Sequence, residues 1–255
     1  MLNPSCVRGI LLDIEGTTTP IAFVHEVLFP FARSNVKDYL MAQLGSAELA
    51  GDLAILSQEH AADVDQSLQP PPLIRGSSDD EIGSMVAYVH WLIDRDRKST
   101  GLKSLQGKIW QQGYREGTLK APVFADVPPA LERWDRAGAN ISIFSSGSIL
   151  AQKLLFANSE AGDLTQFIDG YFDRTSGAKT SAESYRQIAL ALRLAAGEIL
   201  FISDVIAELN AAAAAGMQTL ICIRVGNQPQ TDPRPHQAIY SFDEIPGFVI
   251  EGKGP

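Results

Sequence analysis

Residues 6–20, CVRGILLDIEGTTTP, contain the strand and the loop that decide the fold. The run from Cys6 to Ile14 is almost continuously apolar and is flanked by turn-forming residues. A short strand that is apolar at successive positions is buried on both faces, which is typical of a parallel sheet. Asp13 and Glu15 stand at the end of this run and are followed by glycine and three threonines. We therefore expect a buried parallel strand that delivers two carboxylates into a loop.

Three similar apolar runs follow much later in the chain, over residues 140–146, 197–204 and 217–225. Helical patterns lie between these runs. Apolar residues spaced three and four apart, or a high alanine content, predict helices over 148–159, 180–197 and 207–216. This alternation of strands and helices predicts an α/β fold with a doubly wound, Rossmann-like parallel sheet as its core.

The segment between the first and second expected strands, residues 20–124, differs from the rest. It contains no convincing strand and carries amphipathic helical patterns, for example in HEVLFPFARSNVKDYLMAQLG and LKSLQGKIWQQGYREG. Its stretch SLQPPPLIRGSSDD, residues 67–80, is expected to form a loop between helices. We therefore expect an α/β core domain of residues 1–19 and 125–255, with residues 20–124 inserted as a helical cap domain.

Composition limits the classes of partner. The formal charge of −9 and the isoelectric point near 4.9 disfavour nucleic acid and anionic membranes, which bind clustered basic surfaces. Two cysteines are too few for a disulfide framework and fit a reducing cytoplasm. No apolar run approaches the roughly 18 residues of a membrane span, and the first residues do not resemble a signal peptide. We expect a soluble, cytoplasmic protein in which a local positive pocket could still bind a small anion.

Polar residues stand where the expected strands end. They are Asp13 and Glu15, then Ser145 and Ser146, then Asp204, with Glu208 one helical turn further on. In an open parallel sheet, ligands bind outside the carboxyl ends of the strands, so we expect these residues to share a site. Neighbouring carboxylates repel each other and favour a compensating cation. Mg²⁺ prefers such oxygen ligands, and Asp13, Asp204 and Glu208 are suitable donors.

The stretch FSSGS, residues 144–148, and Lys179 add the features of a phosphate site. Small residues at a strand-to-helix turn allow backbone N–H groups and a serine hydroxyl to surround an anion. Lys179, just before the next expected helix, would supply a fixed positive charge. Each feature alone is more often a turn, a helix cap or a solvated side chain. Their order at the ends of successive strands favours a phosphoryl-transfer site.

These motifs resemble those of the haloacid dehalogenase superfamily. The stretches that carry the resemblance are DIEGTTTP, SSGS, the lysine in GAKTSAESYRQIA, and FISDVIAELNAA. Glu15 stands where most phosphatases of the superfamily have aspartate. With LLDIEGTTTPIAFVHEVLFPF, FADVPPALERW and SSGSILAQKLLFANS, this resembles the enolase-phosphatase family of methionine salvage, the acireductone synthases.

The resemblance implies a magnesium-dependent, cytoplasmic, monomeric enzyme. Its substrate would be 2,3-diketo-5-methylthiopentyl-1-phosphate, which is enolised and then dephosphorylated to 1,2-dihydroxy-3-keto-5-methylthiopentene. By the same resemblance, the metal ligands would be Asp13, Glu15 and Asp204, and the substrate-binding residues would be Ser145, Ser146 and Lys179. Asp13 would be the nucleophile. Lys98, Lys103 and Lys108 in the insertion are weaker candidates for substrate contacts, because most such charges are solvated.

Several alternatives stay open from the sequence alone. Another phosphatase of the superfamily would act on a sugar phosphate or glycolate phosphate without enolising it. A dehalogenase would not need magnesium or the acid at Glu15. A receiver-like phosphoacceptor module also uses acids, a hydroxyl and a lysine around magnesium, but the long insertion argues against it. A non-catalytic scaffold would not need every proposed catalytic position to be occupied.

Overall fold

The computed structural model describes residues 3–95, 97, 99–227 and 236–245. The chain divides into two compact units, one made of the chain up to Val24 together with the chain from Lys120 onward, and the other of His25–Leu119. The expected division fell after residues 19 and 124. The residues just after Lys120 belong to the first unit because the backbone N–H of Ala121 donates to Asn158 O at 3.0 Å.

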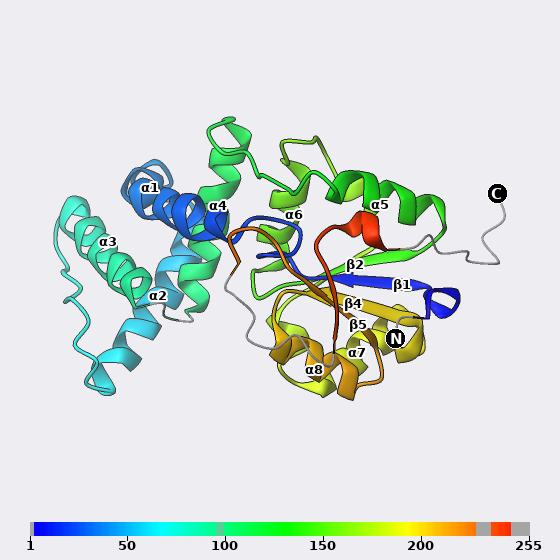
Figure 1. Ribbon diagram of the computed structural model, residues 1–255. Coiled ribbons are helices and arrows are strands. Elements are labelled where there is room, and N and C mark those ends of the chain that lie inside the picture. Colours follow the sequence, from blue (N-terminus) through cyan, green and yellow to red (C-terminus); the bar gives the residue numbers. More distant parts are fainter. Residues whose placement is uncertain (1–2, 96, 98, 228–235, 246–255) are drawn as a thin grey trace. The chain divides into compact units, whose positions relative to one another are not determined.

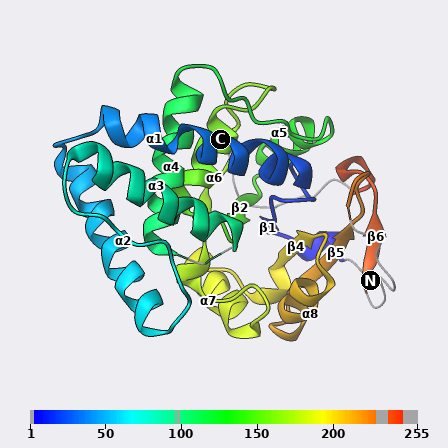
Figure 2. The same ribbon diagram turned by 90° about the vertical axis from the view of Figure 1, so that its left-hand side faces the viewer.

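The first unit is built on one sheet of six parallel strands in the order β3-β2-β1-β4-β5-β6 (Figure 2). The strands are β1 (Gly9–Leu12), β2 (Asn140–Phe144), β3 (Gly170–Phe172), β4 (Ile199–Ser203), β5 (Gln218–Cys222) and β6 (Gln237–Ile239). The chain begins in the middle of the sheet, builds outward to β3, and then returns to the other side of β1. This order is that of doubly wound, Rossmann-like folds, so the expected fold class is confirmed.

Strands β3 and β6 were not predicted. Each has three residues and lies at an edge of the sheet, and neither is uniformly buried. An edge strand of this length needs no continuous apolar run, so its sequence lacks the signal that marks β1 and β4.

Helices cover both faces of the sheet (Figure 1). They are α5 (Val127–Arg136) and α6 (Ile149–Ala157) on one face, and α7 (Ala182–Leu192) and α8 (Ile206–Ala214) on the other. On the second face, Tyr185 and Leu209 join Leu11, Phe144 and Phe201 of the strands in one buried cluster. Burial on both faces explains why β1 and β4 are apolar at successive positions.

The second unit is helical. A π-helical turn (Phe23–Leu28) crosses the division and is followed by α1 (Phe29–Ala42), α2 (Ala47–Asp65), α3 (Ser78–Asp94) and α4 (Thr100–Arg115). Serine caps begin three of them: Ser46 accepts from the N–H of Leu49, Ser77 from that of Asp80, and Ser99 from that of Leu102. The expected loop at 67–80 is observed between α2 and α3, although α3 already begins at Ser78.

Short 3-10 turns complete the described elements, at Pro4–Cys6, Thr165–Phe167, Arg174–Ser176, Ala196–Glu198 and Phe242–Glu244. Among the described residues, none of the helices has both the length and the apolar character that crossing a membrane requires.

Candidate active site

Three of the expected site residues follow directly on neighbouring central strands. Asp13 comes after β1, and its N–H still pairs with Ile202 O of β4 at 3.0 Å. Ser145 comes after β2 and Asp204 after β4. All three side chains are buried, with Asp13 only 2% exposed. Because β2, β1 and β4 are adjacent, these residues stand together at the carboxyl edge of the sheet, where α/β folds bind ligands.

Lys179 joins two of the acids. Its ammonium lies 2.5 Å from Asp13 Oδ1 and 2.7 Å from Glu208 Oε2. The backbone of this lysine is fixed from α7, because the Tyr185 hydroxyl donates to Lys179 O at 2.7 Å. The lysine side chain is buried, so its charge is held in place rather than solvated. The structure thus places Lys179 beside two of the carboxylates, whereas its role stays a prediction.

Glu208, in the first turn of α8, is the second partner of Lys179. Ser203, the last residue of β4, donates its hydroxyl to Glu208 Oε2 at 3.0 Å. The two contacts aim the glutamate at the lysine rather than at solvent. This arrangement fits the supporting role expected for Glu208.

Glu15 and Ser145 are brought together, whereas Ser146 is exposed. The Ser145 hydroxyl lies 3.4 and 3.3 Å from the two carboxylate oxygens of Glu15 and also accepts the N–H of Gly147 at 3.1 Å. The serine is thus part of the cluster itself. The next helix, α6, is capped by Ser148, which accepts the N–H of Ala151 at 3.3 Å.

A tight turn follows Glu15. The N–H groups of Thr17, Thr18 and Thr19 all point at Ile14 O, at 3.1, 2.9 and 3.0 Å. Gly16 has φ of +77°, and a Cβ atom there would lie 2.4 Å from Asp204 Oδ2. The glycine is therefore required both by backbone conformation and by the close approach of the carboxylate.

Replacing Gly16 by alanine should cost both stability and activity. We expect a loss of about 1–3 kcal/mol in the free energy of unfolding, because the residue has a left-handed φ. The clash with Asp204 should also lower turnover by about 100-fold or more, since misplacing a catalytic group by about 1 Å has effects of this size. Thermal unfolding and steady-state kinetics would measure the two effects.

Gly45→Ala is the matched control for this substitution. Gly45 has φ of +82°, but a Cβ atom there would meet nothing within 4 Å. It should lose stability without losing turnover. Equal kinetic losses in the two variants would contradict the role given to the Gly16 contact.

The cluster strongly perturbs its own acids. Burial, together with the nearby charge of Asp13, raises the pKa of Asp204 to about 7 and that of Glu208 to about 7. Burial and Asp13 also raise the pKa of Glu15. Burial alone would lower the pKa of Lys179, but Asp13, Glu208 and Glu15 outweigh it and hold this pKa above its usual range. The acids therefore carry more negative charge than one lysine balances.

A pH dependence of stability follows from the raised pKa values. The folded state favours the protonated forms of Asp204 and Glu208. Their contribution to folding stability is therefore complete below the pKa values of these groups in the unfolded chain, near pH 4. It is lost as the pH rises through the folded values of about 7. In the presence of a chelator, the melting temperature should fall by several degrees between about pH 5 and 8. Glu208→Gln should flatten this slope, and a slope of opposite sign in wild-type protein would contradict the assignment.

The cluster has the donor chemistry for a hard divalent cation. Among the described residues, no three His, Cys, Asp or Glu side chains form a ready-made metal site. Mg²⁺ does not require one, because it keeps several waters and takes phosphate oxygens of the substrate as ligands. Glu15 and Asp204 have pKa values raised by burial and by the charge of Asp13, and such carboxylates fit an ion that would relieve the repulsion.

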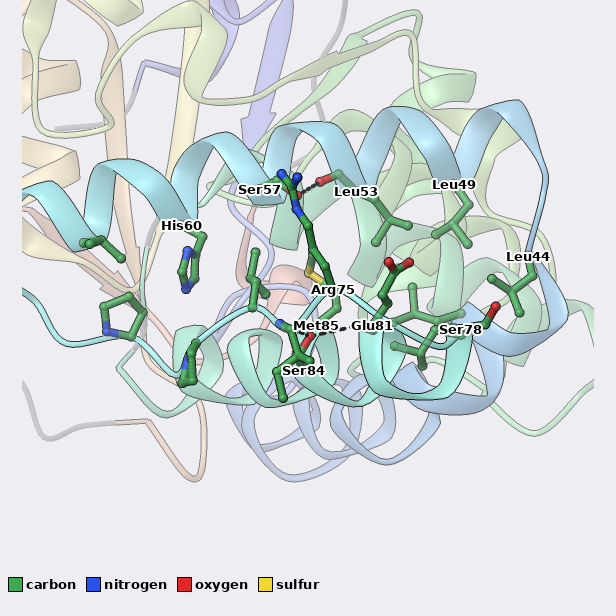
Figure 3. Close-up of a pocket in the computed structure, with 17 residues that line it drawn as sticks. Leu44, Leu49, Leu53, Ser57, His60, Arg75, Ser78, Glu81, Ser84 and Met85 are labelled. Carbon is green, nitrogen blue, oxygen red and sulfur yellow. Dashed lines mark hydrogen bonds between the residues drawn. The ribbon is translucent and has the colours of Figure 1, made fainter.

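The helical unit contains a separate hollow of about 740 Å³ between α2, α3 and the loop that joins them (Figure 3). Its lining is mostly apolar, and Arg75 and Glu81 are the charged residues that reach into it. It offers no cluster of acids with a buried lysine, so the strand-end site is the candidate for catalysis.

Of the lysines considered in the insertion, Lys108 pairs with Asp52 at 2.7 Å and with Glu48 at 3.1 Å, inside the helical unit. Its charge is thus already compensated by two acids of its own unit. Lys98 lies outside the described residues.

Two residues beyond β5 were not among the expected site residues. Arg224 and Asn227 follow that strand and bond to the turn after Glu15, through Thr17 O and Gly16 O. They belong to the same carboxyl edge as the other site residues. The rule that polar residues after strands gather at one edge would have found them, had it been applied to the residues that follow the apolar run of 217–223 as well.

Comparison with known proteins shows the family of this chain. Residues 7–216 match the haloacid dehalogenase-like hydrolases. An enolase-phosphatase E1 of Synechococcus elongatus is 50% identical over 95% of this chain and 99% of its own. A probable bifunctional methylthioribulose-1-phosphate dehydratase/enolase-phosphatase E1 of Arabidopsis thaliana is 44% identical over 93% of this chain, which spans 48% of that protein.

A solved structure covers almost the whole fold. The UTR4 protein of Saccharomyces cerevisiae is 35% identical, and the match covers 94% of this chain and all of that one, with a TM-score of 0.77. The similarity thus extends over the strands that hold the acidic cluster and over the helical insertion.

Proposed function

Because the chain belongs to the haloacid dehalogenase-like hydrolases and, within them, to the enolase-phosphatase E1 family, we propose that it is an enolase-phosphatase of methionine salvage. The substrate would be 2,3-diketo-5-methylthiopentyl-1-phosphate, and the products 1,2-dihydroxy-3-keto-5-methylthiopentene and phosphate. The observation that carries the proposal is the buried group of Asp13, Lys179 and Glu208 at the carboxyl edge of the sheet, beside Glu15 and Ser145.

Asp13 is the proposed nucleophile. Its carboxylate oxygen forms a bond to phosphorus while the bond from phosphorus to the enol oxygen of the substrate breaks. Water then attacks the aspartyl phosphate, releases inorganic phosphate and restores the carboxylate. Lys179, at 2.5 Å from Asp13 Oδ1, holds the nucleophile in place and offsets negative charge on the phosphate oxygens. Ser145 and Ser146 are proposed to bind the phosphate group.

Phosphatases of this family generally depend on a metal ion, and we propose Mg²⁺ for this protein. Asp13, Glu15 and Asp204 would hold it. The ion would supply positive charge beside the transferring phosphate. Glu208 supports the arrangement by holding Lys179 from its other side.

Glu15 is the proposed proton carrier, because it is an acid with a raised pKa beside the nucleophile. Glu15→Gln keeps the size of the side chain and its contact with the Ser145 hydroxyl, but it cannot exchange protons. We expect turnover of the diketo phosphate to fall by about 100-fold to 10,000-fold, with folding intact. Stopped-time assays of enolisation and of phosphate release would assign the loss to one step.

The surface variant Glu160→Gln serves as a control, since Glu160 is exposed. Full activity of Glu15→Gln in both steps would show that Glu15 does not carry protons.

The test of the proposed function is one reaction followed by two signals. The protein is mixed with the diketo phosphate, with and without Mg²⁺, while phosphate release and the ultraviolet absorbance of the enediol are recorded together. Magnesium-dependent growth of both signals is expected. Phosphate release from simple esters without turnover of the diketo compound would favour the second candidate, a phosphatase of the same superfamily that does not enolise its substrate.

Three further properties belong to this proposal. The helical unit His25–Leu119 would serve as the cap that excludes water during enolisation. The protein would act as a monomer on a small phosphorylated substrate, which light scattering on purified protein would check. It would work in the cytoplasm, with no nucleic-acid or membrane partner.

A further inference from the structure

The turn after Glu15 is held from outside by two side chains of the segment that follows β5. Asn227 donates its amide to Gly16 O at 2.8 Å. Arg224 donates its Nε–H to Thr17 O at 3.1 Å. These carbonyls belong to Gly16 and Thr17, the two residues that come directly after Glu15. The position of the glutamate is therefore coupled to the end of β5, more than two hundred positions later in the chain.

Arg224 has a fixed orientation. Its Nη1 lies 2.8 Å from Asp126 Oδ2 and 3.2 Å from Tyr240 O. The guanidinium carbon lies 4.5 Å from the centre of the Phe124 ring and 4.8 Å from that of the Phe242 ring. The side chains of Arg224 and Asp126 are 5% and 10% exposed. The two rings and the Asp126 carboxylate hold the planar guanidinium in one orientation. In this orientation its Nε–H points toward the turn.

One of the residues that hold Arg224, Phe124, also holds the turn. The backbone N–H of Phe124, whose ring stacks on Arg224, donates to Thr18 O at 3.1 Å. Asp126 accepts the N–H of Phe242 at 2.6 Å in addition to the arginine. Three consecutive carbonyls of the turn are thus each bonded to a donor outside it. None of these donors touches the acids Asp13 or Glu208 in the contacts that the described residues make.

We propose that Arg224 and Asn227 are positioning residues for Glu15. The inference rests on the proposed function, in which Glu15 acts beside the nucleophile, and it is carried by the hydrogen bonds that hold the turn. The contact between Glu15 and Ser145 is long for a hydrogen bond between oxygens, 3.3–3.4 Å, so a small shift of the turn breaks it. Without its outside donors, the turn would keep its internal bonds to Ile14 O but would no longer have a fixed place beside the nucleophile.

Two variants test the proposal. Asn227→Ala removes the hydrogen bond from this half-buried side chain to Gly16 O, and it leaves no buried charge without a partner. Arg224→Lys keeps a cation for Asp126. A single ammonium cannot, however, donate to Asp126 and to Thr17 O at the same time, as the guanidinium does. For each variant we expect kcat on the diketo phosphate to fall about 10-fold to 100-fold, with KM changed by less than about threefold. Hydrogen exchange at the amides of residues 16–19 should become faster.

Arg133→Lys is the matched control. Arg133 donates to Phe242 O at 2.9 Å and so binds the same segment as Arg224 without reaching the turn. It should leave kcat and the exchange of residues 16–19 unchanged. A purely structural role of Arg224 would lower the melting temperature and leave kcat at a permissive temperature unaltered.

The two readouts separate this inference from the proposed function. Hydrogen exchange needs no substrate, so it reports on the turn even if the wild-type protein does not convert the diketo phosphate, an outcome that would contradict the proposed function alone. Unchanged exchange at residues 16–19 in both variants would overturn the positioning role. Faster exchange with an unchanged kcat would also overturn it, because Glu15 would then act without needing the turn to be held.

Discussion

Replacing Asp13 by asparagine is expected to reduce phosphate release by about 10,000-fold or more, which is the effect of removing a covalent nucleophile. The amide has nearly the size of the carboxylate, so the site should keep its shape. Lys179 would lose one partner but keep Glu208 at 2.7 Å, and the pKa values of Asp204 and Glu208 would still be raised by burial but no longer by the charge of Asp13. The melting temperature should therefore change little. Steady-state assays and thermal unfolding of the same preparation would show the two results together.

Asp135→Asn controls for the change of carboxylate to amide, because Asp135 is exposed near the end of α5, which leads into the amino end of β2 rather than its carboxyl end. Trapping of labelled phosphate on the wild-type protein after acid quench would identify the aspartyl phosphate, and Asp13→Asn should trap none. Retention of more than about a tenth of wild-type turnover would exclude Asp13 as the nucleophile.

Replacing Lys179 by methionine is expected to have the second largest effect. The substitution leaves Asp13 and Glu208 buried without their shared cation, and breaking a buried ion pair from one side costs about 3–5 kcal/mol. Turnover should fall by about 1,000-fold, because the nucleophile loses its fixed partner and the phosphate loses a positive charge. Chemical denaturation and kinetics would measure the two losses.

The double variant Lys179→Met with Glu208→Gln separates stability from catalysis. Neutralising Glu208 removes one of the two stranded charges, so part of the lost stability should return while turnover stays low. Lys153→Met, at an exposed position of α6, should change neither quantity. Recovery of turnover in the double variant would show that Lys179 acts only by stabilising the fold.

The central part of the sheet could be predicted from the sequence because its signal is local. β1 and β4 are buried on both faces and are therefore apolar at successive positions. Asp13 and Asp204 follow these strands directly, so their meeting at one edge follows from the parallel direction of the strands. The short edge strands β3 and β6 had no such signal, since an edge strand of three residues has no fully buried run to display.

The partners within the site could not be read in the same way. Nothing near Lys179 in the sequence indicates that it binds Asp13, which lies 166 positions earlier, and Glu208 at the same time. The sequence also does not indicate that Ser145 is buried and Ser146 exposed, because both are serines in one short loop. Side-chain pairing depends on strand order and helix orientation, and these are properties of the folded chain.

The doubly wound core, the helical insertion and the acids at the strand ends could be predicted from the chain because burial and strand direction leave local apolar patterns. The folded chain was needed to show that Lys179 bridges two acids, that Glu15 meets Ser145, and that Arg224 bonds the turn after Glu15. Each of these contacts joins segments that follow different strands, so its geometry arises only when the strands assemble into the sheet.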